Sequence, residues 1–351
     1  MPALTPQFLY NLETRMQILT ESEYARMMNN LWYQSITKMR QSTGAKDIIP
    51  WLLSTAQIKP QGKGGNVAYD ELVSTYTEIE SNNAGTGLKL EVNQLKDTDG
   101  GGMQLASQWS TDIGAYMAYW PQKEVTRLLK NGHDVTKFSS YDAKAFFATD
   151  HPVNPFNTNA GTFQNIFTGG AVGASGNTPA YPGACPIDDS VTTEVALVNL
   201  GKIMSYIASI RMPNGEDPRY LYPRGLLVPP RMFPRAVQLT SAKFLAQTAG
   251  SAGGSGDVEA LIKALGFATP MQAPELAGFE SDTTFFVIAE QASSSQLGGI
   301  IYTEREPFSI AYYGNIDQVT LGRARQLEWL CDGRNVISPG HPYLIFKCKG
   351  A

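Results

Sequence analysis

The feature that most constrains the fold is a long run of apolar residues at helical spacing near the middle of the chain. The residues that recur at steps of three and four, and so share one helix face, are Leu105, Trp109, Ile113, Tyr116 and Trp120. The pattern continues past Pro121, and Asn131-Gly132 is a typical helix end. From Met103 to Lys130 such a helix would be about 42 Å long. Since Pro121 lacks a backbone N–H, we expect a kink or two abutting helices there.

The length and net charge of the chain limit the classes of protein to which it can belong. The 351 residues, 42% of them hydrophobic, are enough for about two domains or one large irregular one. A net charge of −4 with no basic block argues against a dedicated nucleic-acid-binding protein. The sequence has neither a long uninterrupted apolar stretch nor a basic start followed by an apolar core, so we expect a soluble chain without a membrane span or secretory signal.

The three cysteines are too few and too scattered for a disulfide framework or a zinc knuckle. We predict that Cys185, Cys331 and Cys348 are buried free thiols. The alternative, a bond between Cys331 and Cys348, would require oxidising conditions.

Two segments in the N-terminal part suggest elements that extend from the body. Residues 8–40 have a helical pattern, and the segment is either an amphipathic arm that packs on another subunit or an ordinary core helix. Residues 75–79 and 88–92 have strand character, and the Asn- and Gly-rich residues 81–87 between them predict a turn. Because an isolated hairpin is marginal in water, this one would lie on a larger sheet or on a partner.

The second half mixes helices with strands that cluster late. We predict a long loop over 154–186, a helix over Val191–Met212, a buried strand at 225–228, and helices over 231–247 and 258–265. Strands are expected at 285–288, 299–302, 308–313, 318–330 and 343–347. Since helices and strands do not alternate regularly, the predicted fold class is α+β.

The one candidate for catalysis is the pair Asp150-His151, which precedes Pro152. Adjacent residues cannot readily face each other as a base and its orienting group must, and no nucleophile elbow or metal-binding His pair is present. We therefore expect Asp150 and His151 to hydrogen-bond local backbone in a turn. The carboxylates Asp188, Asp189 and Glu194 lie where helix N-terminal capping explains them. No catalytic, cofactor-binding or metal-binding residue is predicted.

Several segments, taken in order, resemble the major head (capsid) subunit of Mu-like tailed phages and prophages. The most specific is Phe146-Phe147-Ala148-Thr149-Asp150-His151-Pro152-Val153, preceded by Tyr141-Asp142. The others are Leu88-Lys89-Leu90-Glu91-Val92, the helix from Tyr116 through Pro121 to Asn131-Gly132, Leu226-Leu227-Val228-Pro229-Pro230 and the run 300–307. The resemblance extends from about residue 70 to the C-terminus.

This resemblance implies the Hong Kong 97 (HK97) type of capsid fold. It suggests an N-terminal arm at 1–54, an E-loop hairpin region at 55–100 and a peripheral domain with a spine helix and long loop at 101–189. An axial domain would occupy 190–310, and C-terminal strands at 311–351 would return to the peripheral domain.

By the same resemblance, the chain is expected to be the major capsid protein of a tailed bacteriophage. It would assemble in the host bacterial cytoplasm into hexamers and pentamers of an icosahedral shell around the DNA genome, without sequence-specific DNA binding and without a membrane. Expected partners are other copies of the chain, a scaffold or protease, a portal and decoration proteins. The alternatives are an HK97-fold nanocompartment or other virion protein, and a hydrolase with a site near Asp150 and His151.

Overall fold

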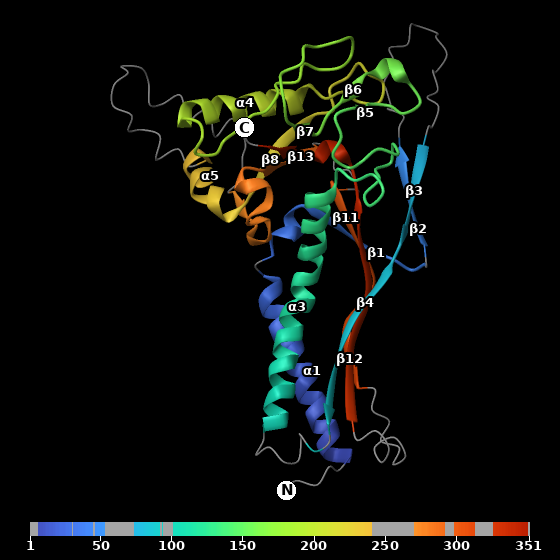
Figure 1. Ribbon diagram of the computed structural model, residues 1–351. Helices are drawn as coiled ribbons and strands as arrows, with labels where there is room; N and C mark the ends of the chain where they lie inside the picture. Colours follow the sequence, from blue (N-terminus) through green and yellow to red (C-terminus); the bar gives the residue numbers. More distant parts are fainter. Residues whose placement is uncertain are drawn as a thin grey trace, which may run out of the picture.

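The structure is a computed structural model that describes residues 6–29, 31–44, 46–52, 74–91, 93, 101–240, 270–291, 298–312 and 326–349. Figure 1 shows an elongated molecule in which two long helices and long strands form the lower part. The upper part contains a second sheet and shorter helices. Helices and sheets are thus mixed without regular alternation, as predicted.

The helices are α1 (Pro6–Met28), α3 (Gly101–Asn131), α4 (Thr193–Ser209) and α5 (Phe233–Thr240). The strands of the described residues include β1 (Thr37–Gln41), β2 (Lys46–Leu52), β3 (Ser74–Glu80), β4 (Asn82–Glu91), β5 (His151–Pro152), β6 (Thr162–Phe163) and β11 (Ile300–Tyr312). The remaining strands are β7 (Ile166–Phe167), β8 (Leu221–Val228), β9 (Met271–Gln272), β10 (Phe285–Gln291), β12 (Gln326–Pro339) and β13 (Ile345–Cys348). Six 3-10 turns are Trp32–Ser35, Thr158–Ala160, Pro230–Met232, Pro274–Leu276, Phe279–Asp282 and Pro342–Leu344.

The predicted central helix is confirmed as α3, which spans the whole predicted range and more. Pro121 lies inside this single helix, so the two abutting helices are not found. The helix ends at Asn131, where a side chain on Gly132 would lie 2.7 Å from the ring of Phe147. A glycine is therefore required where the chain leaves the helix and passes Phe147.

The helix at the N-terminus is shorter than expected and has a partner. It ends at Met28, and residues 37–41 form strand β1, which pairs in parallel with β11. α1 packs along α3, and the Thr20 hydroxyl donates to the Ser110 carbonyl oxygen at 3.0 Å. Of the two alternatives left open by the sequence, α1 is therefore a core helix of its own chain.

The predicted hairpin with a turn at 81–87 is wrong. β3 pairs antiparallel with β2, and β4 pairs antiparallel with β12, so residues 82–91 are strand along their whole length. A Cβ atom on Gly85 would lie 2.7 Å from the carbonyl oxygen of Cys331. The glycine thus permits close approach to β12 and does not make a turn. The segment between β2 and β3 lies outside the described residues.

The lower sheet has the order β1-β11-β12-β4. Its apolar face and the two long helices share one core, formed by Leu12, Met16, Leu90, Ala106, Ile113, Met117, Ile310, Leu327, Trp329 and Cys331. β11 is one strand with two irregularities in its pairing to β12, where the sequence suggested two separate strands. β12 confirms the described part of the strand predicted at 318–330 and continues to Pro339, whereas residues 318–325 lie outside the described residues.

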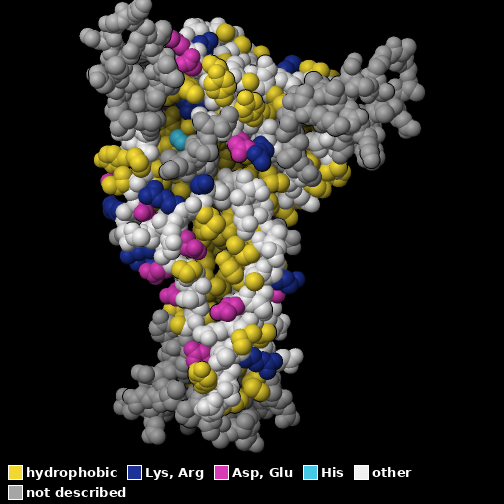
Figure 2. Space-filling view, turned by 180° about the vertical axis from the view of Figure 1, so that it is seen from behind, with side chains coloured by type: hydrophobic (Ala, Val, Ile, Leu, Met, Phe, Trp, Pro, Cys, Tyr) yellow, Lys and Arg dark blue, Asp and Glu magenta, His cyan; other side chains and the backbone are white. Residues whose placement is uncertain are grey.

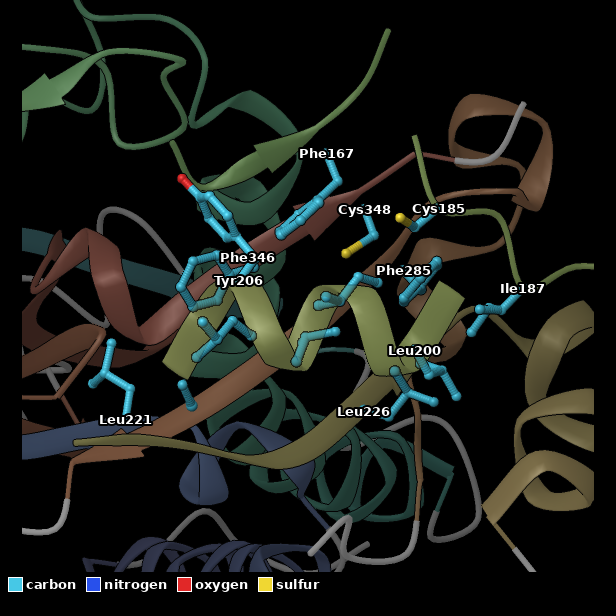
Figure 3. Packing of buried hydrophobic residues seen from close by; sticks show 14 of the residues in the cluster. Phe167, Cys185, Ile187, Leu200, Tyr206, Leu221, Leu226, Phe285, Phe346 and Cys348 are labelled. Atoms are coloured by element: carbon cyan, nitrogen blue, oxygen red, sulfur yellow. The ribbon is translucent and has the colours of Figure 1, made fainter. Parts of the chain in front are cut away.

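The upper sheet has the order β7-β13-β10-β8-β9. α4, which confirms the helix predicted over Val191–Met212, packs on this sheet. Figure 3 shows the core between them, which includes Phe167, Leu200, Leu226, Phe285 and Phe346. α5 confirms the described part of the helix predicted at 231–247, whereas residues 241–247 and the predicted helix at 258–265 lie outside the described residues.

All three cysteines are free and buried, as predicted. Cys185 and Cys348 lie in the upper core (Figure 3), whereas Cys331 lies in the lower one. The alternative bond between Cys331 and Cys348 is therefore contradicted. Burial raises the pKa of the Cys331 thiol to about 11. No helix in the described part of the chain is long and apolar enough to cross a membrane.

Candidate functional site: the His151 turn and the Trp51 cluster

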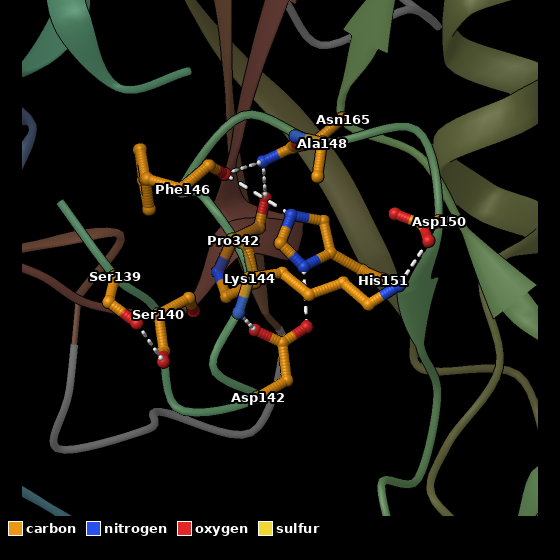
Figure 4. Close-up of polar contacts among 10 residues, drawn as sticks. All are labelled: Ser139, Ser140, Asp142, Lys144, Phe146, Ala148, Asp150, His151, Asn165 and Pro342. Atoms are coloured by element: carbon orange, nitrogen blue, oxygen red, sulfur yellow. Dashed lines mark hydrogen bonds and ion pairs between the residues drawn. The ribbon is translucent and has the colours of Figure 1, made fainter. Parts of the chain in front are cut away.

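His151, the residue singled out by the sequence, is fully buried beside a carboxylate. Its Nδ1 donates to Oδ2 of Asp142 at 2.6 Å, and both side chains are 0% exposed. Its Nε2 lies 3.2 Å from the carbonyl oxygen of Phe146 (Figure 4). The ring also stacks on Phe163, with centroids 5.2 Å apart. The imidazole is thus held from both edges and one face.

Asn165 completes this polar cluster. Its side-chain amide donates to the carbonyl oxygens of Phe146 at 2.6 Å and Pro342 at 3.0 Å, and its Oδ1 accepts from the backbone N–H of Ala148 at 3.0 Å. These bonds connect the loop after α3 to the turn that precedes β13. Because buried polar groups are costly without partners, a satisfied cluster of this kind specifies one loop conformation.

The structure separates the two residues of the candidate catalytic pair. Asp150 points outward and forms an ion pair with Lys144, with 62% of its side chain exposed (Figure 4). The expectation that Asp150 and His151 bond mainly to local backbone is therefore only partly right, since each has a side-chain partner. The buried His151–Asp142 pair has no access for a substrate in this conformation, so its evident role is to hold the loop.

The Asp142 partner was not predicted, because it lies nine residues before His151 in sequence. The only available signal was its presence in Tyr141-Asp142, one of the segments that carry the family resemblance. A sequence cannot show that a loop returns and brings these two side chains together.

A second cluster lies near the end of the β2–β3 pair from which residues 53–73 connect the two strands. The ring of Trp51, on β2, lies 4.5 Å from that of His341, edge to face, and His341 stacks on Tyr343 at 4.7 Å. The Arg219 guanidinium lies 3.9 Å above Tyr343 on the far side. Trp51 also donates from Nε1 to the Thr77 hydroxyl of β3 at 2.8 Å. This column of four side chains attaches the hairpin to the upper part of the molecule.

Acid should weaken this attachment. Burial, and secondarily the charge of Arg219, lower the pKa of His341 to about 3. Between the unfolded pKa of about 6.5 and pH 3, the unfolded chain binds a proton that the folded chain excludes. The contribution of His341 to the free energy of unfolding is therefore fully present above pH 6.5. Below pH 6.5 this contribution decreases as the pH falls, by at most about 1.4 kcal/mol per pH unit.

The measurement is the free energy of unfolding of the wild type and His341→Phe between pH 4 and 8. Phenylalanine retains an aromatic ring that cannot be protonated, so the variant should lose less stability toward acid. Parallel pH profiles for the two proteins would contradict a neutral, buried His341.

The arrangement of helices and sheets places the chain in a known structural class. It superposes on the capsid protein of cyanophage P-SCSP1u with a TM-score of 0.52 at 11% identity, over 92% of this chain and 88% of that one. The procapsid of bacteriophage JBD30 is also similar, with a TM-score of 0.48 at 15% identity over 99% of this chain and 77% of that one. The mature capsid of bacteriophage PhiM1 matches with a TM-score of 0.47 at 11% identity over 92% and 87%. The fold is that of HK97-type phage capsid proteins.

The family comparison is more specific. Residues 13–179 match the family described as Mu-like prophage major head subunit gpT, which confirms the family that the sequence resembles. The match begins before residue 70, where the resemblance was expected to start, and extends to residue 179. The matched region contains the greater part of α1, all of α3, strands β2 and β3 and the His151 turn. No curated protein matches the chain. Together, the matched family and the shared fold support a phage major capsid protein, as predicted.

Proposed function

We propose that the chain assembles into hexamers and pentamers of an icosahedral head that encloses the phage DNA. The observation that carries the proposal is the match to a major head subunit family in a chain that has the capsid fold. In this assembly the expected axial domain at 190–310 would comprise the elements from α4 to β10, whereas β11 belongs to the lower sheet. Residues 101–189 and the returning strands within 311–351 would form the peripheral domain.

The β2–β3 hairpin supports this proposal because its two faces differ. One face packs on the chain's own body, where Ile49, Trp51 and Ile79 are at most 5% exposed. The other carries Ile48 and Tyr76, which are 56% and 63% exposed. The exposed face also carries the ion-paired Lys46, Glu78 and Glu80, and apolar side chains gathered among charges on a surface are typical of an interaction site. We infer that this face is covered by a neighbouring subunit. β3 lies in the E-loop region expected at 55–100, whereas β2 lies within the arm expected at 1–54, so the E-loop hairpin would begin earlier than the sequence suggested.

For the first 54 residues we propose a smaller role in contacts between subunits than the free arm that the sequence suggested. Since α1 packs on α3 of its own chain, it does not need a neighbour as a folding partner. Contact with other subunits by an N-terminal arm would then use the outward side of α1, where Tyr10 and Ile18 are 65% and 60% exposed. Figure 2 shows such apolar side chains on both parts of the molecule, among charges of both signs.

The proposed role is structural and not enzymatic. The buried His151–Asp142 pair supports this, since it holds a loop and reaches no surface. A net charge of −4 suits a container that does not bind its DNA tightly. Assembly would take place in the host cytoplasm, with a scaffold or protease, a portal and decoration proteins as partners.

Negative-stain imaging of the purified protein, alone and with its phage's scaffold, tests this proposal. Closed shells or rings of five and six subunits are expected. A compact monomer under every assembly condition would contradict it. Nucleic acid in particles purified from infected cells is expected, whereas an enclosed enzyme and no DNA would favour the nanocompartment alternative.

A further inference from the structure

The long loop that follows the His151 turn forms one wall of a cavity beside α4. Residues 171–182 are held as a hairpin by the backbone bridges Val172–Tyr181 and Ser175–Thr178. The other wall is the C-terminal half of α4, and the cavity between them has a volume of about 590 Å³. Figure 1 shows this hairpin at the top of the molecule, above α4. A cavity of this volume, with two ordered walls, is large enough to receive a ligand or a segment of a partner.

Two positive charges line this cavity, and no negative charge among the described lining residues balances them. These charges belong to Lys202 and Arg211. Lys202 is exposed and forms no ion pair with a described residue. The Arg211 guanidinium is fixed by donation to the carbonyl oxygens of Gly215 at 3.2 Å and Glu216 at 2.9 Å. Charges of one sign in a cavity attract a group of the opposite sign.

The hydroxyl groups on both walls already have partners in the chain. The Thr178 hydroxyl, on the loop, accepts from the backbone N–H of Thr162 at 3.0 Å. The Tyr206 hydroxyl, on α4, accepts from the backbone N–H of Gln164 at 2.8 Å. The unbalanced feature of the cavity is therefore its charge, which indicates a carboxylate as the occupant.

A carboxylate that matches the cavity lies just before the other end of α4. The turn there is fixed by Asp188, whose Oδ1 accepts from the backbone N–H of Ser190 at 3.0 Å. Between these two residues, Asp189 is exposed and forms no ion pair with a described residue. From Thr193 to Ser205, which lines the cavity, α4 rises about 18 Å. The Asp189 turn of a chain therefore cannot enter the cavity of the same chain.

We propose that the Asp189 turn of one copy enters the α4 cavity of the next copy in a ring, with the Asp189 carboxylate beside Lys202. The contact joins two different surfaces, as the repeated contacts around a ring of subunits do. It rests on the proposed function, in which α4 belongs to the axial domain at the ring centre. A ring also holds each turn near a neighbouring cavity at high local concentration, which favours a second copy over a free acidic peptide.

Two cysteines test the contact, because it joins two different positions. Ser190→Cys and Ser205→Cys in one chain replace an exposed serine of the turn and an exposed serine of the cavity, and leave all charges in place. Assembled particles are oxidised mildly with copper–phenanthroline, which takes two electrons and two protons from each thiol pair as the S–S bond forms. Subunits should link in a ladder up to pentamers and hexamers. Within one chain the two thiols are too far apart to bond.

Three controls accompany this experiment. Each single-cysteine variant should stay monomeric, since identical positions do not meet in a contact between different surfaces. The wild type should not link, because its three thiols are buried. The matched control combines Ser190→Cys with Ser22→Cys, at an exposed serine of α1, and should give no ladder.

Charge reversal tests the residues of the contact. In the two-cysteine chain, Asp189→Lys or Lys202→Glu alone would bring like charges together and should lower linking about tenfold. Asp189→Lys together with Lys202→Glu should restore linking. Lys38→Glu, the same change at an exposed lysine of β1, should leave linking unchanged. The melting temperature of the subunit should be the same in all of these variants, since the replaced side chains are exposed.

The outcomes separate this contact from the proposed function. Shells without a ladder, a ladder that stops at dimers, or linking that ignores charge reversal would overturn the contact and leave the capsid assignment intact. A charge-dependent ladder in a protein that never forms closed shells would support the contact and contradict the proposed assembly.

Discussion

Replacing His151 by alanine is expected to destabilise the protein by about 3–5 kcal/mol. The substitution removes the side-chain donor to Asp142 and leaves that carboxylate, 0% exposed, with the backbone N–H of Lys144 at 3.2 Å as its remaining hydrogen-bond donor. It also opens a cavity against Phe163 and removes one contact to the carbonyl oxygen of Phe146. The expected result is a lower denaturant midpoint and melting temperature, and a loss of assembled particles at the temperature where the wild type assembles.

Two matched variants make this prediction specific. Asp150→Asn alters the neighbouring but exposed pair with Lys144 and should change stability by less than about 1 kcal/mol. Asp142→Asn retains a hydrogen-bond acceptor beside His151 and should cost less than His151→Ala. If His151→Ala and Asp150→Asn had similar small effects on stability, the buried His151–Asp142 pair would not be what holds the loop in its conformation.

Gly114→Ala in α3 should also be strongly destabilising, although alanine is the better helix former. The added Cβ would lie 2.5 Å from the Thr20 carbonyl oxygen, which is backbone and has no rotamer to move away. Overpacking of this kind costs about 1–3 kcal/mol after any gain in helix propensity. We expect α1 to separate from α3, with a lower unfolding free energy and faster amide hydrogen exchange in α1.

The control is Gly201→Ala in α4, where a Cβ atom meets nothing within 4 Å. The same substitution there should stabilise the isolated subunit by up to about 1 kcal/mol, since only helix propensity changes. Equal effects at the two positions would show that α1 does not pack closely on α3. The comparison therefore tests directly whether α1 is a core helix or a free arm.

The sequence identified elements whose signal is local. α3 and α4 were predicted from apolar residues at helical spacing, because each buries one continuous face along its own length. The buried thiols and the mixed α+β class were also predicted correctly. Recognition of Mu-like head subunits depended on the order of short segments, of which the one around His151 was the most specific.

Strand partners were decided only by the tertiary structure. Residues 82–87 suggested a turn because Asn and Gly tolerate positive φ, but the same small residues allow the backbone of β12 to approach closely. Local composition cannot distinguish these two uses of glycine, since the difference lies in a strand from the other end of the chain. For the same reason β3 was assigned to the wrong partner.

For the polar contacts too, the sequence determined the local backbone and the tertiary structure decided the partners. The sequence by itself determined that His151 begins an extended segment before Pro152, because proline restricts the residue before it. Only the folded chain decided that Asp142, and not the adjacent Asp150, receives its hydrogen bond. Side chains of consecutive residues in an extended segment point in opposite directions, so one is buried and the other reaches solvent. The partner of a buried side chain is then chosen by whichever loop packs over it.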